Sequence, residues 1–209
     1  MKFDNFKTKI KNLPLFSTSF ISTLTDDSKT LKVQLSTWKK KGLIVTLRKG
    51  LYVLRENEEK MPSTFYLANQ MYIPSYVSME SALHYHGLIP EFVVQITSIT
   101  TRKTITFKNK FGVFTYQHLK PEAYTGFTHI GETDSNLQSL IANPEKAIVD
   151  FLYLNLSIFN ESNPDIFQKS YRFQNCEKVN RKKIKTYAKP FNSKKLIVIS
   201  DLFIREVLK

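Results

Sequence analysis

The order of elements predicted for residues 16–54 constrains the fold of this chain more than any other feature. Ser17 is a suitable N-cap for a short helix, because its hydroxyl can accept from an unpaired backbone N–H. Phe20, Ile21 and Leu24 are expected to form the buried side of that helix. A polar turn at residues 26–28 follows, and its last serine can cap a longer helix that stops at Gly42. Two helices joined by a polar turn are therefore expected here.

The longer of these helices has an apolar face and a basic face. Leu31, Leu35 and Trp38 recur at the helical i, i+4, i+7 spacing and are expected to face the core. The opposite face suits nucleic acid, because lysine and serine can contact phosphates or base edges and a small apolar side chain can contact a thymine methyl. The predicted contact residues on that face and at the helix end are Lys29, Lys32, Val33, Ser36, Lys39 and Lys40.

A basic β-hairpin is expected directly after this helix. The β-prone runs 43–47 and 51–54 are joined by Arg48-Lys49-Gly50, in which glycine suits the tight turn. Arg48 and Lys49 at the tip are placed to reach phosphates or the minor groove. Helix, turn, helix and basic hairpin in this order predict a winged helix-turn-helix that binds double-stranded DNA. The alternative is a solvated basic face without a nucleic-acid partner.

Positive charge is concentrated at the two ends of the chain, whose net charge is +13. Residues 1–60 hold 13 Lys/Arg and 6 Asp/Glu (+7), residues 61–150 hold 6 and 7 (−1), and residues 151–209 hold 12 and 5 (+7). Two basic ends around a neutral middle favour a polyanionic partner. A general surplus of surface lysine would also raise the net charge, so that alternative stays open.

Composition argues against several classes of protein. Hydrophobic residues make up 42% of the chain, which is too many for wholesale disorder. No apolar run approaches the about 20 residues that span a bilayer, so no membrane partner is expected. Residues 1–7 lack the apolar core of a signal peptide. Cys176 is the single cysteine, which excludes an intramolecular disulfide, suits a reducing cytoplasm and predicts a partly buried thiol.

A polar segment that ends at Pro62 separates the predicted DNA-binding part from the rest of the chain. Periodicity and turn signals predict helices at 4–13, 63–71, 78–86, 143–154, 165–173, 180–188 and 193–208, and strands at 95–101, 104–107, 112–118, 126–130 and 137–142. The run 196–199 within the last helix could also be a strand. The expected fold is α+β, with a winged helix-turn-helix at residues 1–58 and, at residues 60–209, a mixed domain with a small antiparallel sheet flanked by helices.

A second basic surface is predicted close to the end of the sequence. Residues 178–195 contain eight basic side chains and no acidic one. They are Lys178, Arg181, Lys182, Lys183, Lys185, Lys189, Lys194 and Lys195. This surface could contact nucleic acid or dock an acidic face of a protein partner, and a merely solvated basic helix is the third interpretation.

Other polar clusters favour structural roles over catalysis. His84 and His86 form a His-x-His pair, but no further ligand stands at a recognisable spacing, and positions i and i+2 of a helix point apart. Lys146 and Asp150 are spaced i, i+4, which predicts a structural ion pair rather than part of a nuclease site. The chain has neither a Gly-x-Ser-x-Gly elbow nor a glycine-rich phosphate loop. We therefore expect no catalytic site, no metal site and no cofactor.

Four segments, in the same order along the chain, resemble one known family. They are Trp38-Lys-Lys-Lys-Gly-Leu-Ile44, Arg48-Lys-Gly-Leu-Tyr52, a Ser-x-x-Ser-Ala-Leu-x-x-His-Gly-Leu pattern within residues 76–90, and Asn143-Pro-Glu-Lys-Ala-Ile-Val-Asp150. Over roughly residues 16–160 the chain is similar to the AbiE-type antitoxins, the antitoxin half of abortive-infection (type IV) toxin–antitoxin systems. The position of His86 before Gly-Leu in the family pattern indicates that it fixes a helix end.

This resemblance implies a cytoplasmic antitoxin that is not an enzyme. Such a protein represses its own operon by binding inverted repeats in the operator DNA, and it counteracts a nucleotidyltransferase-like toxin. Two other classes stay open. A nucleic-acid-processing enzyme could use the winged helix only for docking, in which case the second domain would need clustered carboxylates or a metal site. A protein–protein adaptor is the other, since many winged helices bind no DNA.

Overall fold

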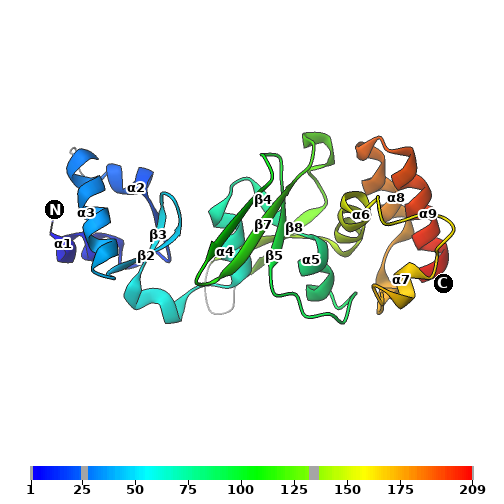
Figure 1. Ribbon diagram of the computed structural model, residues 1–209, viewed down its shortest axis with the longest axis horizontal. Helices are drawn as coiled ribbons and strands as arrows, with labels where there is room; N and C mark the ends of the chain where they lie inside the picture. Colours follow the sequence, from blue (N-terminus) through cyan, green and yellow to red (C-terminus); the bar gives the residue numbers. More distant parts are fainter. Residues whose placement is uncertain (1, 25–27, 132–136, 209) are drawn as a thin grey trace. The chain divides into compact units, whose positions relative to one another are not determined.

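The computed structural model describes residues 2–24, 28–131 and 137–208, except the side chains of Ser28, Lys29 and Lys32. The chain is α+β and divides into two compact units, each described separately below (Figure 1). Unit 1 consists of Met1–Ser63 and Phe107–Phe111, and unit 2 of Thr64–Thr106 and Gly112–Lys209. Among the described residues, no helix is both long enough and apolar enough to cross a membrane.

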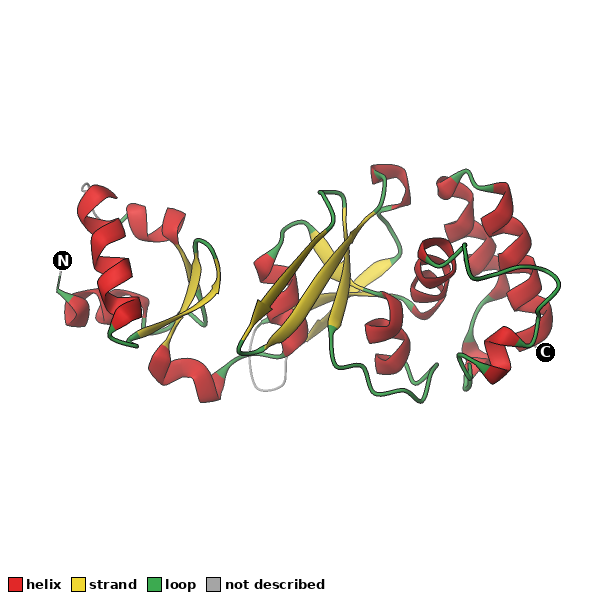
Figure 2. Cartoon of the chain, in the orientation of Figure 1, coloured by secondary structure: helices red, strands yellow, loops and turns green. Residues whose placement is uncertain are grey.

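Unit 1 combines helices with a small antiparallel sheet (Figure 2). Its described elements are α1 (Phe3–Ile10), β1 (Phe16–Ser17), α2 (Thr18–Ser22), α3 (Ser28–Lys40), β2 (Ile44–Arg48), β3 (Leu51–Leu54) and the 3-10 helix η1 (Arg55–Lys60). Strand β3 lies between β1 and β2 and pairs antiparallel with both. The predicted helices and hairpin are present. Strand β1 was not predicted, because two residues are too few to show alternation.

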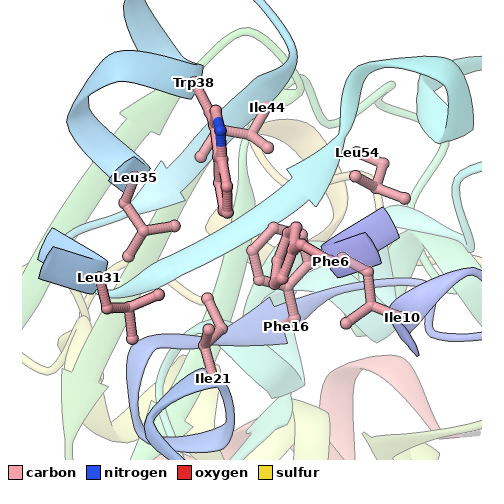
Figure 3. Packing of buried hydrophobic residues seen from close by; sticks show 9 residues of the cluster. All are labelled: Phe6, Ile10, Phe16, Ile21, Leu31, Leu35, Trp38, Ile44 and Leu54. Carbon is pink, nitrogen blue, oxygen red and sulfur yellow. The ribbon is translucent and has the colours of Figure 1, made fainter. Parts of the chain in front are cut away.

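A cluster of aliphatic and aromatic side chains forms the core of unit 1 (Figure 3). The indole of Trp38 stacks on the ring of Phe6, with centroids 4.6 Å apart and planes 24° from parallel. The ring of Phe3 meets the same indole edge-on at 5.3 Å. Leu31 and Leu35 are buried beside it, so the predicted inward face of α3 is confirmed.

Helix α2 buries less of its apolar surface than the sequence predicted. Ile21 is fully buried, as expected, but the side chain of Phe20 is exposed and Leu24 is only half-buried. The helix is five residues long, so only one side of it can reach the core. The expectation that Phe20 is buried was therefore wrong.

The ends of α2 and α3 follow the residue chemistry. The Oγ atom of Ser17 accepts from the backbone N–H of Phe20 at 3.1 Å and so caps α2. After α3, Gly42 adopts φ +68°, its N–H donates to the Lys39 carbonyl, and the next N–H donates to the Trp38 carbonyl. These two bonds are the Schellman pattern. The predicted turn residues 26–27 and the capping side chain of Ser28 lie outside the described residues.

The larger sheet is mixed rather than antiparallel. Its six strands within the described residues are β4 (Ser75–Val77), β5 (Ile96–Thr100), β6 (Ile105–Asn109), β7 (Gly112–His118), β8 (Phe127–Gly131) and β9 (Gln138–Ala142), in the order β6-β7-β5-β4-β9-β8. Strand β4 is antiparallel to β5 but parallel to β9, and β5 is parallel to β7. The predicted small antiparallel sheet was wrong, because the sequence did not reveal the three-residue strand β4 that joins both halves.

Some helices of unit 2 pack on this sheet, and others pack mainly against one another (Figure 2). They are α4 (Thr64–Met71), α5 (Met79–Tyr85), α6 (Pro144–Leu154), α7 (Ile166–Lys169), α8 (Arg181–Ala188) and α9 (Lys194–Val207), with short 3-10 turns η2 (Pro121–Ala123), η3 (Cys176–Lys178) and η4 (Lys189–Phe191). Helix α4 contacts β4, β5 and β9, whereas α5 contacts β5 and α6. Helices α6, α8 and α9 contact one another. The run 196–199, for which the sequence allowed either a helix or a strand, lies within helix α9.

Candidate nucleic-acid interface

A groove on unit 1 brings α3 and the β2–β3 hairpin to one surface. Its volume is about 590 Å³, and it is lined by Thr18, Leu35, Ser36, Lys39, Thr46, Lys49, Gly50 and Tyr52. Ser36 and Lys39 come from α3, whereas Lys49 comes from the turn of the hairpin. Three residues predicted to bind DNA therefore share one concave surface, although they are separated in sequence.

The other predicted residues have different positions. Val33 is 67% exposed on α3, and Lys40 is exposed at the last position of that helix. Arg48 is half-buried, and its Nη1 donates to the carbonyl oxygen of Lys49 at 2.8 Å, which holds the guanidinium against the hairpin turn. Lys29 and Lys32 belong to α3, but their side chains are outside the described part of the structure.

The lysines of this surface have no carboxylate partner in the described part of the chain. Among the described residues, Lys39, Lys40 and Lys49 are exposed and form no ion pair with Asp or Glu. Uncompensated cations on two neighbouring elements raise the local potential and attract polyanions. The groove is therefore basic as well as concave.

Thr46 is a groove residue that the sequence did not single out. Its Oγ1 atom is buried and has no hydrogen-bond partner among the described residues. A buried hydroxyl without a hydrogen-bond partner costs about 1–3 kcal/mol. Sequence inspection missed Thr46 because threonine is ordinary in a strand. Its pairing opposite Tyr52 shows that the two side chains line the same hollow.

The second basic surface lies on and around α8. All eight basic residues predicted for it are exposed. The fold brings Asp201 of α9 within 2.7 Å of the Nζ atom of Lys185, and Arg181 donates to the carbonyl oxygen of Leu208. Two of the cations are therefore already engaged. The sequence indicated no acid here because Asp201 lies outside the basic run.

The Lys146–Asp150 pair is structural. Both side chains are fully buried in α6 and form an ion pair, as the i, i+4 spacing predicted. The Oδ2 atom of Asp150 also accepts from the Tyr76 hydroxyl at 2.9 Å and from the Ser78 hydroxyl at 2.8 Å. Burial raises the pKa of Asp150 and lowers that of Lys146. A pair closed to solvent on all sides has no access to a substrate.

The two histidines do not come together as ligands. The Nε2 atom of His86 lies 2.8 Å from the carbonyl oxygen of Ala142, and Gly87 follows with φ +69°, so His86 ties the end of α5 to β9. The His84 ring instead meets the Phe92 ring edge-on at 5.9 Å. Within the described ranges, no three His, Cys, Asp or Glu side chains are grouped as a metal site would need.

Comparison with known proteins assigns no family to this chain. No protein-family model matches the sequence, and no curated protein matches it significantly.

Proposed function

We propose that unit 1 is a winged helix-turn-helix that binds double-stranded DNA. The observation that carries this proposal is the basic groove in which Ser36 and Lys39 of α3 face Lys49 of the hairpin. In this proposal α3 enters the major groove, which admits one helix. The hairpin is the wing and contacts the adjacent backbone or minor groove.

The roles of the side chains follow from their chemistry and exposure. Val33 is exposed and apolar, so it contacts a thymine methyl, and Ser36 contacts a base edge. The cations at the end of the helix and at the hairpin turn hold phosphates; they are Lys39, Lys40, Arg48 and Lys49. Lys29 and Lys32 are assigned to the same helix face from their sequence positions.

We further propose that the protein is a cytoplasmic, non-enzymatic antitoxin that represses its own operon by binding inverted repeats. Support comes from the four segments that resemble the AbiE-type antitoxins, in particular the Asn143-Pro-Glu-Lys-Ala-Ile-Val-Asp150 helix. In the structure this segment supplies the start of α6 and the Lys146–Asp150 pair, around which α5 and α8 pack. Its partner is a nucleotidyltransferase-like toxin.

Base contacts and phosphate contacts can be distinguished by how binding depends on the DNA sequence. The test measures affinity for promoter DNA from the protein's own operon and for a set of single-base variants of that promoter. Ser36→Ala should change the ranking of the variants, whereas Arg48→Ala should weaken all of them about equally. If Ser36→Ala and Arg48→Ala both leave every affinity unchanged, the proposed interface is wrong.

The antitoxin role is tested in cells. A nucleotidyltransferase gene adjacent to the gene for this chain is expressed alone and together with it. The proposal predicts growth arrest by the toxin alone and restored growth on co-expression of both. Absence of a nucleotidyltransferase neighbour, or arrest that co-expression does not relieve, would contradict the antitoxin assignment and leave the DNA-binding assignment to its own test.

A further inference from the structure

Unit 2 contains an apolar pocket that none of the basic residues line. Its volume is about 600 Å³. Leu83 of α5 and Phe151 of α6 form part of its wall, Ile89, Phe92 and Val94 come from the loop after α5, and Tyr171 follows α7. Pockets of about 300–1,000 Å³ with apolar walls and a few polar groups are typical of small-molecule sites.

The loop over the pocket exposes more apolar surface than a folded protein usually leaves in water. The side chains of Phe92 and Val94 are 81% and 82% exposed. Both line the pocket, so an occupant would cover apolar surface that is otherwise in contact with solvent.

The loop is nevertheless tied down near both ends. The Ser81 hydroxyl donates to the Gln95 carbonyl at 3.2 Å and accepts from the Thr97 N–H at 2.9 Å. At the other side, Arg172 donates from Nε and Nη2 to one oxygen of Glu91, at 2.8 and 2.6 Å. The pocket is thus largely formed before any ligand enters, which lowers the entropy lost on binding.

Two carboxylates line the pocket, and they differ in their partners. Glu91 is neutralised by Arg172 and has a pKa below its ordinary value, mainly because of that hydrogen bond. Glu80 forms no ion pair with any described residue, and burial raises its pKa. Glu80 and Tyr171 both line the pocket, and the Glu80 charge adds to burial in raising the pKa of the Tyr171 hydroxyl. A cation from outside would compensate Glu80.

The aromatic lining suits the same ligand chemistry. The rings of Phe151 and Tyr171 meet edge-on with centroids 4.9 Å apart, and Phe92 lines the pocket from the loop. Aromatic faces attract ammonium and guanidinium groups, most strongly where water is excluded. We propose that this pocket binds a small organic cation with an apolar body, the ammonium or amidinium beside Glu80 and the hydrocarbon against Leu83, Phe151 and Tyr171.

The test uses the full chain, with 1-naphthylmethylammonium as the probe and 1-naphthylmethanol as its neutral counterpart, titrated by isothermal calorimetry. The wild-type protein should bind the ammonium more tightly than the alcohol. Glu80→Gln should weaken ammonium binding by about tenfold or more, because a hydrogen bond between two charged groups is lost. Binding of the neutral alcohol should not change. Glu122→Gln is the matched control, because it removes the same charge from an exposed residue that does not line the pocket.

A blocking variant locates the binding. Ser170 lines the pocket but is exposed, so Ser170→Trp fills the site without disturbing the core and should abolish binding of both probes. Equal affinity for the two probes, together with no effect of Glu80→Gln, would overturn the proposed cation specificity. Absence of ammonium binding to the wild-type chain, or binding that survives Ser170→Trp, would overturn the site itself.

Discussion

At the scale of single residues, the chemistry of Cys176 follows from its burial. The thiol is buried, as its sequence context predicted, and its Sγ donates to the Gln174 carbonyl oxygen at 3.2 Å. Burial raises the pKa of Cys176 from 9.0 to about 11. Because the thiolate is the reactive form, the fraction available at pH 8 falls about a hundredfold. At pH 8 the thiol of the folded protein should react with an aromatic disulfide about a hundredfold more slowly than the thiol of the denatured protein. Equal rates would contradict the burial of Cys176 and its raised pKa.

The Lys146–Asp150 pair gives a second residue-scale prediction. Asp150→Ala leaves a lysine buried without its counter-ion and should lower the free energy of unfolding by about 3–5 kcal/mol. The matched control is Asp165→Ala, which removes an exposed i, i+4 partner of Lys169 and should change stability by less than about 0.5 kcal/mol. Urea denaturation measures both. Similar losses of unfolding free energy for the two variants would show that burial does not set the contribution of the Lys146–Asp150 pair to stability.

The sequence predicted this ion pair but not its surroundings. The i, i+4 spacing within one helix is a local signal, and it is sufficient for Lys146 and Asp150. The Tyr76 and Ser78 hydroxyls that donate to Asp150 precede it by 74 and 72 residues, and only the fold brings them there. The same holds for Thr46, because only the placement of its strand beside α3 reveals that its hydroxyl is buried and has no partner among the residues described.

At the scale of elements, the end of α3 sets the direction of the chain into the hairpin. Gly42 has φ +68°, and a Cβ atom there would meet no atom within 4 Å, so only backbone strain opposes a side chain. Gly42→Ala should destabilise the protein by about 1 kcal/mol for this reason. Gly131→Ala, which adds a Cβ in equally open space without a positive φ, is the control and should be close to neutral by urea denaturation. If Gly42→Ala left the free energy of unfolding unchanged, Gly42 would not be the glycine C-cap of α3.

Elements were predictable where their signals are local. Helix α3 has an apolar stripe and a glycine C-cap, α6 starts at an Asn-Pro-Glu sequence, and the β2–β3 hairpin has a glycine turn, so all three were found. Strands β1 and β4 are two and three residues long and are stabilised by distant partners, so neither was found. Missing β4 changed the topology, because the parallel pairing with β9 depends on it.

At the scale of the whole molecule, the sequence gives the net charge of each segment, and the structure shows which charged side chains are paired. The +7 excess in residues 1–60 agrees with the uncompensated lysines on the groove of unit 1. The basic run around α8 is partly engaged within the fold, because Lys185 pairs with Asp201 and Arg181 donates to the Leu208 carbonyl. We therefore expect the groove of unit 1 to dominate DNA affinity. Lys182→Gln/Lys183→Gln on α8 should reduce that affinity less than Lys39→Gln/Lys49→Gln, and the reverse order in a binding titration would assign the main contact to α8.

The most direct test of DNA binding through the groove is the salt dependence of that binding. Affinity for the operon's own promoter is measured by fluorescence anisotropy over a range of salt concentrations, for the wild type, for Lys39→Gln/Lys49→Gln and for the control Lys9→Gln/Lys11→Gln. Each phosphate contact contributes a slope of about −0.9 to the plot of log affinity against log salt, so the groove variant should lose about two such contributions. The control removes two exposed lysines at the end of α1 that do not line the groove, and its slope should match the wild type. Identical slopes and affinities for all three proteins would contradict the proposed interface.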